Sequence, residues 1–150
     1  MSSPLLNTTI PNADKLTDDD VILVTGGTGL FGKGVEAVKN QYQLKGKWIF
    51  LSSKDGDLRS KAVCDELFQK HKPTYVLHLA AFVGGLFRNM KFKAEFWMNN
   101  VNMNNNILQN CYDFGVCVCM CFCLWDISCV SFYYSCFEKA FSPVFMTVSS

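Results

Sequence analysis

The chain has 150 residues, a formal net charge of +1 and a hydrophobic fraction of 49%, which suits one domain with a sizeable core. Balanced charge without a lysine or arginine run excludes an extended nucleic-acid-binding surface. The first twenty residues are polar and acidic and lack the basic and apolar segments of a secretory signal peptide, so we expect a cytoplasmic protein without a secreted disulfide framework.

Strand and helix patterns alternate along the chain after a leader, residues 1–20, that we expect to be flexible. Short, wholly apolar runs are typical of parallel strands buried on both faces, and apolar residues three or four apart are typical of helices. We expect strands at 21–24, 47–51 and 75–78, and helices from the glycine-rich turn to Gln41, at 58–70 and at 94–112.

This alternation predicts an α/β fold: the N-terminal half of a doubly wound parallel Rossmann sheet, here truncated. The crossovers between its strands should be right-handed. We assign the half-domain to residues 21–115 and separate from it an apolar, cysteine-rich tail at 116–150.

A glycine-rich turn with the pattern TGxxGxxG follows the first strand and opens the first helix. Gly26 should permit the tight turn, Gly29 should let the backbone approach a pyrophosphate, and Gly32 should let the helix lie close to the strands. The N–H groups and dipole of a helix start favour phosphate. We therefore expect a nicotinamide dinucleotide to bind at Gly26, Gly27, Thr28, Gly29, Leu30, Phe31 and Gly32.

The end of the second strand bears on the choice of cofactor. An acidic residue there would hold the ribose 2′-hydroxyl of NAD, but this chain has Ser52, Ser53 and Lys54. Two hydroxyls and a cation suit a 2′-phosphate and favour NADP(H), while the neighbouring Asp55 keeps NAD as an alternative.

Further candidates follow the second and third strands. Asp57, next to Leu58, is expected either to accept a hydrogen bond from the adenine amino group or to cap the following helix. His78 is expected to be a hydrogen-bonded core histidine rather than a base. Small side chains at Leu79, Ala80 and Ala81 lie where the cofactor ribose should pass.

Four segments together, TGGTGLFG, SSKDGDL, HLAA and FVGGLFRN, resemble the GDP-L-fucose synthase family of extended short-chain dehydrogenases/reductases from about Val21 to Gly115. The resemblance implies epimerisation and NADPH-dependent reduction of the nucleotide sugar GDP-4-keto-6-deoxymannose to GDP-L-fucose. It places Asp57 and Leu58 at the border of the adenine and adds Val83 and Asn100 on the ribose and nicotinamide side. Asn100 has a solvent-facing polar role as its alternative. Full-length members are expected to be homodimers.

The catalytic groups that the resemblance implies are a serine, a Tyr-x-x-x-Lys motif, and a cysteine and histidine for epimerisation. No Tyr-x-x-x-Lys occurs in this sequence, and no catalytic residue is assigned. We also expect the substrate-binding C-terminal domain to be missing. The chain is therefore interpreted as an inactive fragment. The alternatives are a non-catalytic NADP(H)-binding fragment and another nucleotide-sugar epimerase or reductase of the superfamily.

The tail begins with alternating valine and cysteine at residues 116–119. An alternating GT repeat encodes Val-Cys-Val-Cys and introns begin with GT, so we interpret the tail as a translated intron. A metal site is disfavoured because the cysteines lack Cys-x-x-Cys spacing. A membrane span over Phe114–Phe137 is disfavoured by Asp126 near its centre. A fourth sheet strand within Val116–Leu124 is compatible with the intron interpretation.

Overall fold

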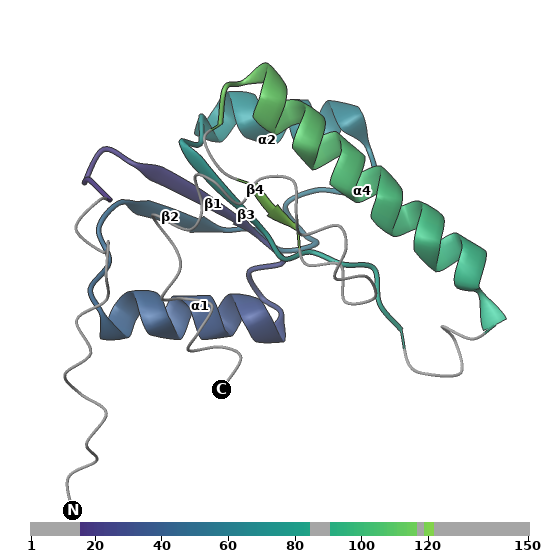
Figure 1. Ribbon diagram of the computed structural model, residues 1–150, viewed down its shortest axis with the longest axis horizontal. Helices are drawn as coiled ribbons and strands as arrows, with labels where there is room; N and C mark the ends of the chain where they lie inside the picture. Colours follow the sequence, from purple (N-terminus) through teal and green to yellow (C-terminus); the bar gives the residue numbers. More distant parts are fainter. Residues whose placement is uncertain (1–15, 85–90, 117–118, 122–150) are drawn as a thin grey trace, which may run out of the picture.

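Helices cover both faces of a four-stranded parallel sheet in the computed structural model, which describes residues 16–84, 91–116 and 119–121 (Figure 1). The sheet has the strand order β2-β1-β3-β4. In chain order the elements are β1 (Val21–Thr25), α1 (Leu30–Gln41), β2 (Lys47–Phe50), α2 (Lys61–His71), β3 (Tyr75–His78), α4 (Lys93–Asp113) and β4 (Cys119–Cys121). The predicted α/β doubly wound half-sheet is thus confirmed.

The two faces of the sheet explain why the central strands are wholly apolar. In β1, Ile22 and Val24 pack with Val35 and Val38 of α1. Between them Leu23 points to the opposite face, into the core formed with α2 and α4. Each fully buried aliphatic side chain contributes roughly 1.5–3 kcal/mol, so a polar residue at any of these positions would weaken the sheet.

The crossovers place the helices on opposite faces. The connection through α1 leads from β1 to its neighbour β2, whereas α2 leads back past β1 to β3 on the other side. Because these moves run in opposite directions and α1 and α2 cover opposite faces (Figure 1), both crossovers have the same hand. The order of the strands therefore reverses between β1 and β3, where α/β proteins bind ligands.

The second helix begins three residues later than its apolar spacing predicts. The prediction starts it at Leu58, but α2 starts at Lys61, with Ser60 as the N-cap residue. The Asp57 side chain accepts hydrogen bonds from the backbone and side chain of Arg59, and Ser60 takes the N-cap position, so the alternative role of Asp57 as helix cap is wrong. At the other end Lys72 takes a left-handed conformation, with φ 46°, and Pro73 keeps the chain from continuing as helix.

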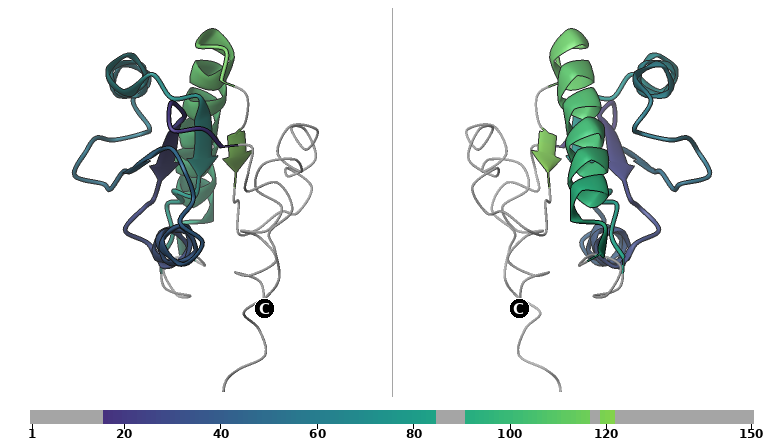
Figure 2. Two further views of the ribbon diagram at one scale, coloured as in Figure 1. Left: turned by 90° about the vertical axis from the view of Figure 1, so that its left-hand side faces the viewer. Right: turned by 90° about the vertical axis from the view of Figure 1, so that its right-hand side faces the viewer.

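The tail contributes one short strand. β4 pairs in parallel with β3, with Leu77 opposite Met120, and it forms the sheet edge away from β2 (Figure 2). The expected fourth strand is confirmed for Cys119–Cys121. The other tail positions that the metal, membrane and intron interpretations concern lie outside the described residues.

The end of the predicted leader lies against the domain. Leu16 is 2% exposed and belongs to the core beneath α1. Asp20 accepts hydrogen bonds from the backbone N–H and the hydroxyl of Thr17, which closes a turn just before β1. The ordered core therefore begins upstream of the predicted boundary at residue 20.

Candidate functional site

The glycine-rich turn leaves β1 with backbone that other residues would not tolerate. Gly26 has φ +68°, and a Cβ there would lie 2.8 Å from the backbone nitrogen of Ala80. Gly27 donates a backbone hydrogen bond to Leu51 O at 2.7 Å, and a Cβ on Gly27 would lie 2.6 Å from Phe50 Cβ. The turn is thus pressed against the ends of both neighbouring strands, which only glycine allows.

The start of α1 is open toward solvent. Gly29 is the N-cap residue, no acidic side chain occupies the first turn, and Leu30 is 85% exposed. The first N–H groups of a helix have no partner within the helix, so this end suits an anion. Gly32 lies against the turn itself, because a Cβ there would meet the backbone of Gly27.

The tight turn after β2 contains Asp55, the acidic residue that would favour NAD. Asp55 Oδ2 accepts hydrogen bonds from the backbone N–H of Ser52 at 2.7 Å and from its hydroxyl at 2.8 Å. The backbone hydrogen bond, and then the hydroxyl, lower the pKa of Asp55. Ser53 and Lys54 lie exposed on the same turn. The Asp55 carboxylate is therefore engaged locally, while the Lys54 cation faces solvent.

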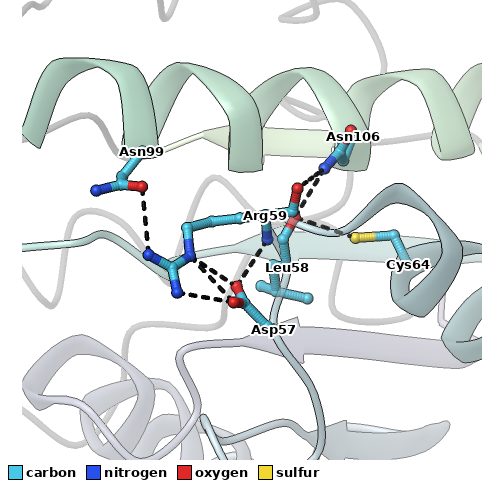
Figure 3. A network of polar contacts seen from close by, with 6 residues as sticks. All are labelled: Asp57, Leu58, Arg59, Cys64, Asn99 and Asn106. Atoms are coloured by element: carbon cyan, nitrogen blue, oxygen red, sulfur yellow. Dashed lines mark hydrogen bonds and ion pairs between the residues drawn. The ribbon is translucent and has the colours of Figure 1, made fainter. Parts of the chain in front are cut away.

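Asp57 and Leu58 have separate roles in the segment between β2 and α2 (Figure 3). Asp57 pairs with Arg59, with 2.8 Å between Asp57 Oδ2 and Arg59 Nη2, and the Arg59 hydrogen bonds lower the pKa of Asp57. The Leu58 side chain is 9% exposed and lies in the core beneath α2 and α4. Its carbonyl accepts a hydrogen bond from Asn106 Nδ2 at 3.0 Å, which fixes the segment to α4.

A buried chain of hydrogen bonds joins the ends of β1 and β3 to α4. His78 is fully buried, which lowers its pKa to about 4, so the ring is neutral at pH 7. Its Nε2 faces Asn104 Oδ1 at 3.0 Å; because that oxygen only accepts, Nε2 donates and Nδ1 accepts from the Thr25 hydroxyl. Thr25 Oγ1 in turn accepts from the backbone N–H of Ala80 at 3.2 Å. The burial of His78 and its two hydrogen bonds confirm the prediction of a bonded core histidine.

Asn100 holds the segment that follows β3. Its Oδ1 accepts from the backbone N–H of Phe82 at 2.7 Å, and its Nδ2 donates to the carbonyl oxygens of Phe82 at 3.0 Å and Phe96 at 2.8 Å. The alternative of a solvent-facing polar role is therefore wrong. The Val83 side chain, just beyond, is 61% exposed.

The candidate residues thus meet at one edge of the sheet. Those on the glycine turn follow β1, those of the serine–lysine turn follow β2, and those from Leu79 to Ala81 follow β3. Because parallel strands end at the same edge, and Gly26 touches Ala80, they border one region. Leu58 is the exception, since its side chain lies in the core.

Sequence reasoning did not find four residues that organise this region: Thr25, Arg59, Phe82 and Asn104. One signal was available, because Asn100 and Asn104 are four positions apart and so lie on the same side of a helix. The partners of these amides are backbone groups and a histidine distant in sequence, and no local pattern identifies them.

Clusters of metal-ligating side chains and membrane-spanning helices are both absent from the part of the chain that the structure describes. It contains no group of three or more histidine, cysteine or acidic side chains arranged to hold a metal ion. Within the same residues, no helix has the length and apolar character needed to cross a membrane.

Several known proteins resemble this chain in sequence. The model of the NAD dependent epimerase/dehydratase family matches residues 22–133. This match runs past Gly115, the expected end of the resemblance. The chain is 48% identical over 105 residues to the GDP-L-fucose synthase of Dictyostelium discoideum, covering 69% of this chain and 33% of that protein. It is 50% identical over 111 residues to the probable GDP-L-fucose synthase of Drosophila melanogaster, covering 73% and 32%.

A solved structure resembles this chain in both fold and sequence. The crystal structure of a GDP-L-fucose synthetase from Naegleria fowleri bound to NADP has a TM-score of 0.64 and 63% sequence identity, covering 70% of this chain and 31% of that chain. The chain therefore spans about a third of the length of these relatives.

Proposed function

Because the chain belongs to the NAD dependent epimerase/dehydratase family, we propose that residues 21–115 form the NADP(H)-binding part of an enzyme of the GDP-L-fucose synthase type. The half-domain binds the pyrophosphate at Gly26–Gly32 and the adenosine phosphate at Ser52–Lys54. The segment from Leu79 to Ala81, with Val83, borders the ribose and nicotinamide side. Asn100 shapes that side through the backbone of Phe82.

The observation that carries this proposal is the packing of the glycine turn. Its backbone lies so close to Ala80 and Phe50 that side chains at Gly26 and Gly27 are excluded. The same turn leads into the open, acid-free start of α1. A backbone cradle at a helix N-terminus fits a pyrophosphate, and the chain offers it at the point where the strand order reverses.

The preference for NADP over NAD rests on the turn after β2. A ribose with a free 2′-hydroxyl needs an acceptor there, and Asp55 Oδ2 already accepts hydrogen bonds from the backbone N–H and the hydroxyl of Ser52. The exposed Lys54 offers a charge that only a 2′-phosphate would match. The NADP bound to the Naegleria fowleri synthetase is consistent with this choice.

The complete reaction needs groups beyond this half-domain. NADPH supplies a hydride when bound, and the resemblance assigns keto-group polarisation to a tyrosine held by a lysine four residues later. The sequence contains no such pair. We therefore propose that this chain binds NADP(H) without converting GDP-4-keto-6-deoxymannose, and that the nucleotide-sugar chemistry and dimer formation belong to the whole enzyme.

Titration of the 150-residue chain with NADPH and with NADH tests the cofactor assignment. NADPH should bind about tenfold more tightly than NADH, because one charge-assisted contact to the 2′-phosphate is worth on the order of 1.4 kcal/mol. Lys54→Ala should abolish the preference. Lys45→Ala, at the opposite end of β2, is the matched control and should preserve it. Absence of binding by either nucleotide would overturn the proposed function.

A further inference from the structure

The Arg59 side chain closes around the Asp57 carboxylate. Arg59 Nε lies 2.9 Å from Asp57 Oδ1 and 3.1 Å from Oδ2, and Nη2 lies 2.8 Å from Oδ2. The backbone N–H of Arg59 also donates to Oδ1, at 3.0 Å. One arginine therefore holds both carboxylate oxygens through its side chain and its backbone.

The hydrogen-bonding capacity of Asp57 is nearly, but not fully, used. An ionised carboxylate has about four acceptor positions. Arg59 fills three of them with three hydrogens, since the single Nε hydrogen is shared between the two oxygens. One acceptor position is left over on an otherwise fixed group.

Arg59 is itself held from a second direction (Figure 3). Its Nη1 donates to Asn99 Oδ1 of α4 at 3.3 Å, and its guanidinium carbon lies 5.7 Å from the centre of the Phe82 ring. The backbone of Phe82 is the group that Asn100 brackets. The guanidinium thus joins the segment after β2 to α4 and to the segment after β3.

We propose that Arg59 is a positioning residue for adenine: it fixes the Asp57 carboxylate so that its one remaining acceptor position receives the exocyclic amino group of the cofactor. This inference rests on the proposed NADP(H) function. The positive charge of Arg59 also offsets the negative charge of the Asp57 carboxylate. The carboxylate can then lie near a polyanionic dinucleotide without repelling it. Among the described residues, Arg59 supplies the hydrogen bonds that hold the Asp57 carboxylate, so loss of Arg59 should leave that side chain free to change rotamer.

An adenine analogue separates positioning from general support. NADPH and its hypoxanthine counterpart differ where adenine carries an amino donor and hypoxanthine a carbonyl acceptor, so only NADPH donates to Asp57. Dissociation constants for both nucleotides are measured on the wild-type chain, Arg59→Gln, Arg59→Lys, Asp57→Asn and the double variant. Lys61→Gln is the control, because Lys61 pairs with Asp65 on the exposed side of α2.

The wild-type chain and Lys61→Gln should prefer NADPH by about tenfold, the value of one hydrogen bond to a charged group. Arg59→Gln should bring the preference close to one, Arg59→Lys should restore part of it, and Arg59→Gln should have no further effect once Asp57 is Asn. Equal weakening of both nucleotides by Arg59→Gln, or an unchanged preference, would overturn the positioning role. Equal affinities on the wild-type chain would overturn this inference alone, whereas binding of neither nucleotide would also overturn the proposed function.

Discussion

Two regions form the same edge of the sheet by opposite means. The glycine turn after β1 works by the absence of side chains, because its backbone lies against Ala80 and Phe50 where no Cβ fits. The asparagines of α4 work by the presence of side chains, because Asn100 and Asn104 hold Phe82 and His78 through their amides.

The difference between the two regions lies in the type of force. A turn that needs glycine fails by steric repulsion, which rises steeply over fractions of an ångström. An amide bonded to backbone groups fails by leaving a donor and an acceptor unsatisfied, which costs about 1–3 kcal/mol. We therefore expect substitutions in the turn to have larger effects than substitutions on α4.

The largest effect should come from Gly26→Ala, with Gly115→Ala as its matched control. Both glycines have nearly the same positive φ, +68° and +65°, but a Cβ on Gly115 meets nothing within 4 Å. The control should lose about 1 kcal/mol of unfolding free energy from backbone strain alone. Gly26→Ala should lose at least about 3 kcal/mol, because it adds a clash with backbone. Equal losses in a denaturant titration would show that the close approach to Ala80 has no energetic weight.

His78 should make the stability of the network depend on pH. Burial lowers its pKa from 6.5 to about 4, so the unfolded chain binds a proton more readily than the folded one. The contribution of His78 to the unfolding free energy is therefore fully present above pH 6.5 and is lost as the pH falls toward 4. About 3 kcal/mol of unfolding free energy is involved, at about 1.4 kcal/mol per pH unit.

The check is the unfolding free energy of the wild-type chain and of His78→Gln between pH 7 and pH 4. The two should converge as the pH falls, because the variant has no buried imidazole to protonate. Parallel curves would mean that the proton uptake of unfolding involves other groups.

A smaller effect is expected for Asn100→Ala. The change removes hydrogen bonds to the backbone of Phe82 and to the carbonyl of Phe96 and should cost about 2 kcal/mol. The amide of Phe82 should exchange its hydrogen faster. Asn105→Ala, at an exposed position of the same helix, should change the unfolding free energy by less than about 0.5 kcal/mol. If both variants behave alike, the clamp on Phe82 is not a stabilising contact.

The same contrast explains what the sequence revealed. The strands were predictable because parallel strands with two covered faces need continuous apolar runs, as in β1 and β3. The glycine turn was predictable because its pattern lies between a strand and a helix. The start of α2 was misplaced because the apolar period at Leu58 continues into a segment that the Asp57–Arg59 pair and Asn106 hold as a loop.

The remaining site contacts depend on tertiary neighbours. Arg59 reads in the sequence as an exposed cation, and its contact with Phe82 joins positions 23 apart in the chain. Thr25 and His78 are recognisable as a pair only once β1 and β3 are known to be adjacent. Local propensity gives the elements, but it does not identify which polar groups the topology brings together.

The most direct test of the central claim, that the glycine turn holds the cofactor pyrophosphate, is the NADPH affinity of Gly29→Asp compared with Gly29→Asn. Gly29 has an ordinary φ of −74° at the N-cap of α1, and a Cβ there meets only Gly26 O, at 3.2 Å. Aspartate and asparagine are both good N-cap residues, so both variants should be at least as stable as the wild-type chain. They differ in the charge placed beside the phosphates. We predict that Gly29→Asp binds NADPH at least about tenfold more weakly than Gly29→Asn, a difference on the order of 1.4 kcal/mol; equal affinities at wild-type strength would contradict the account.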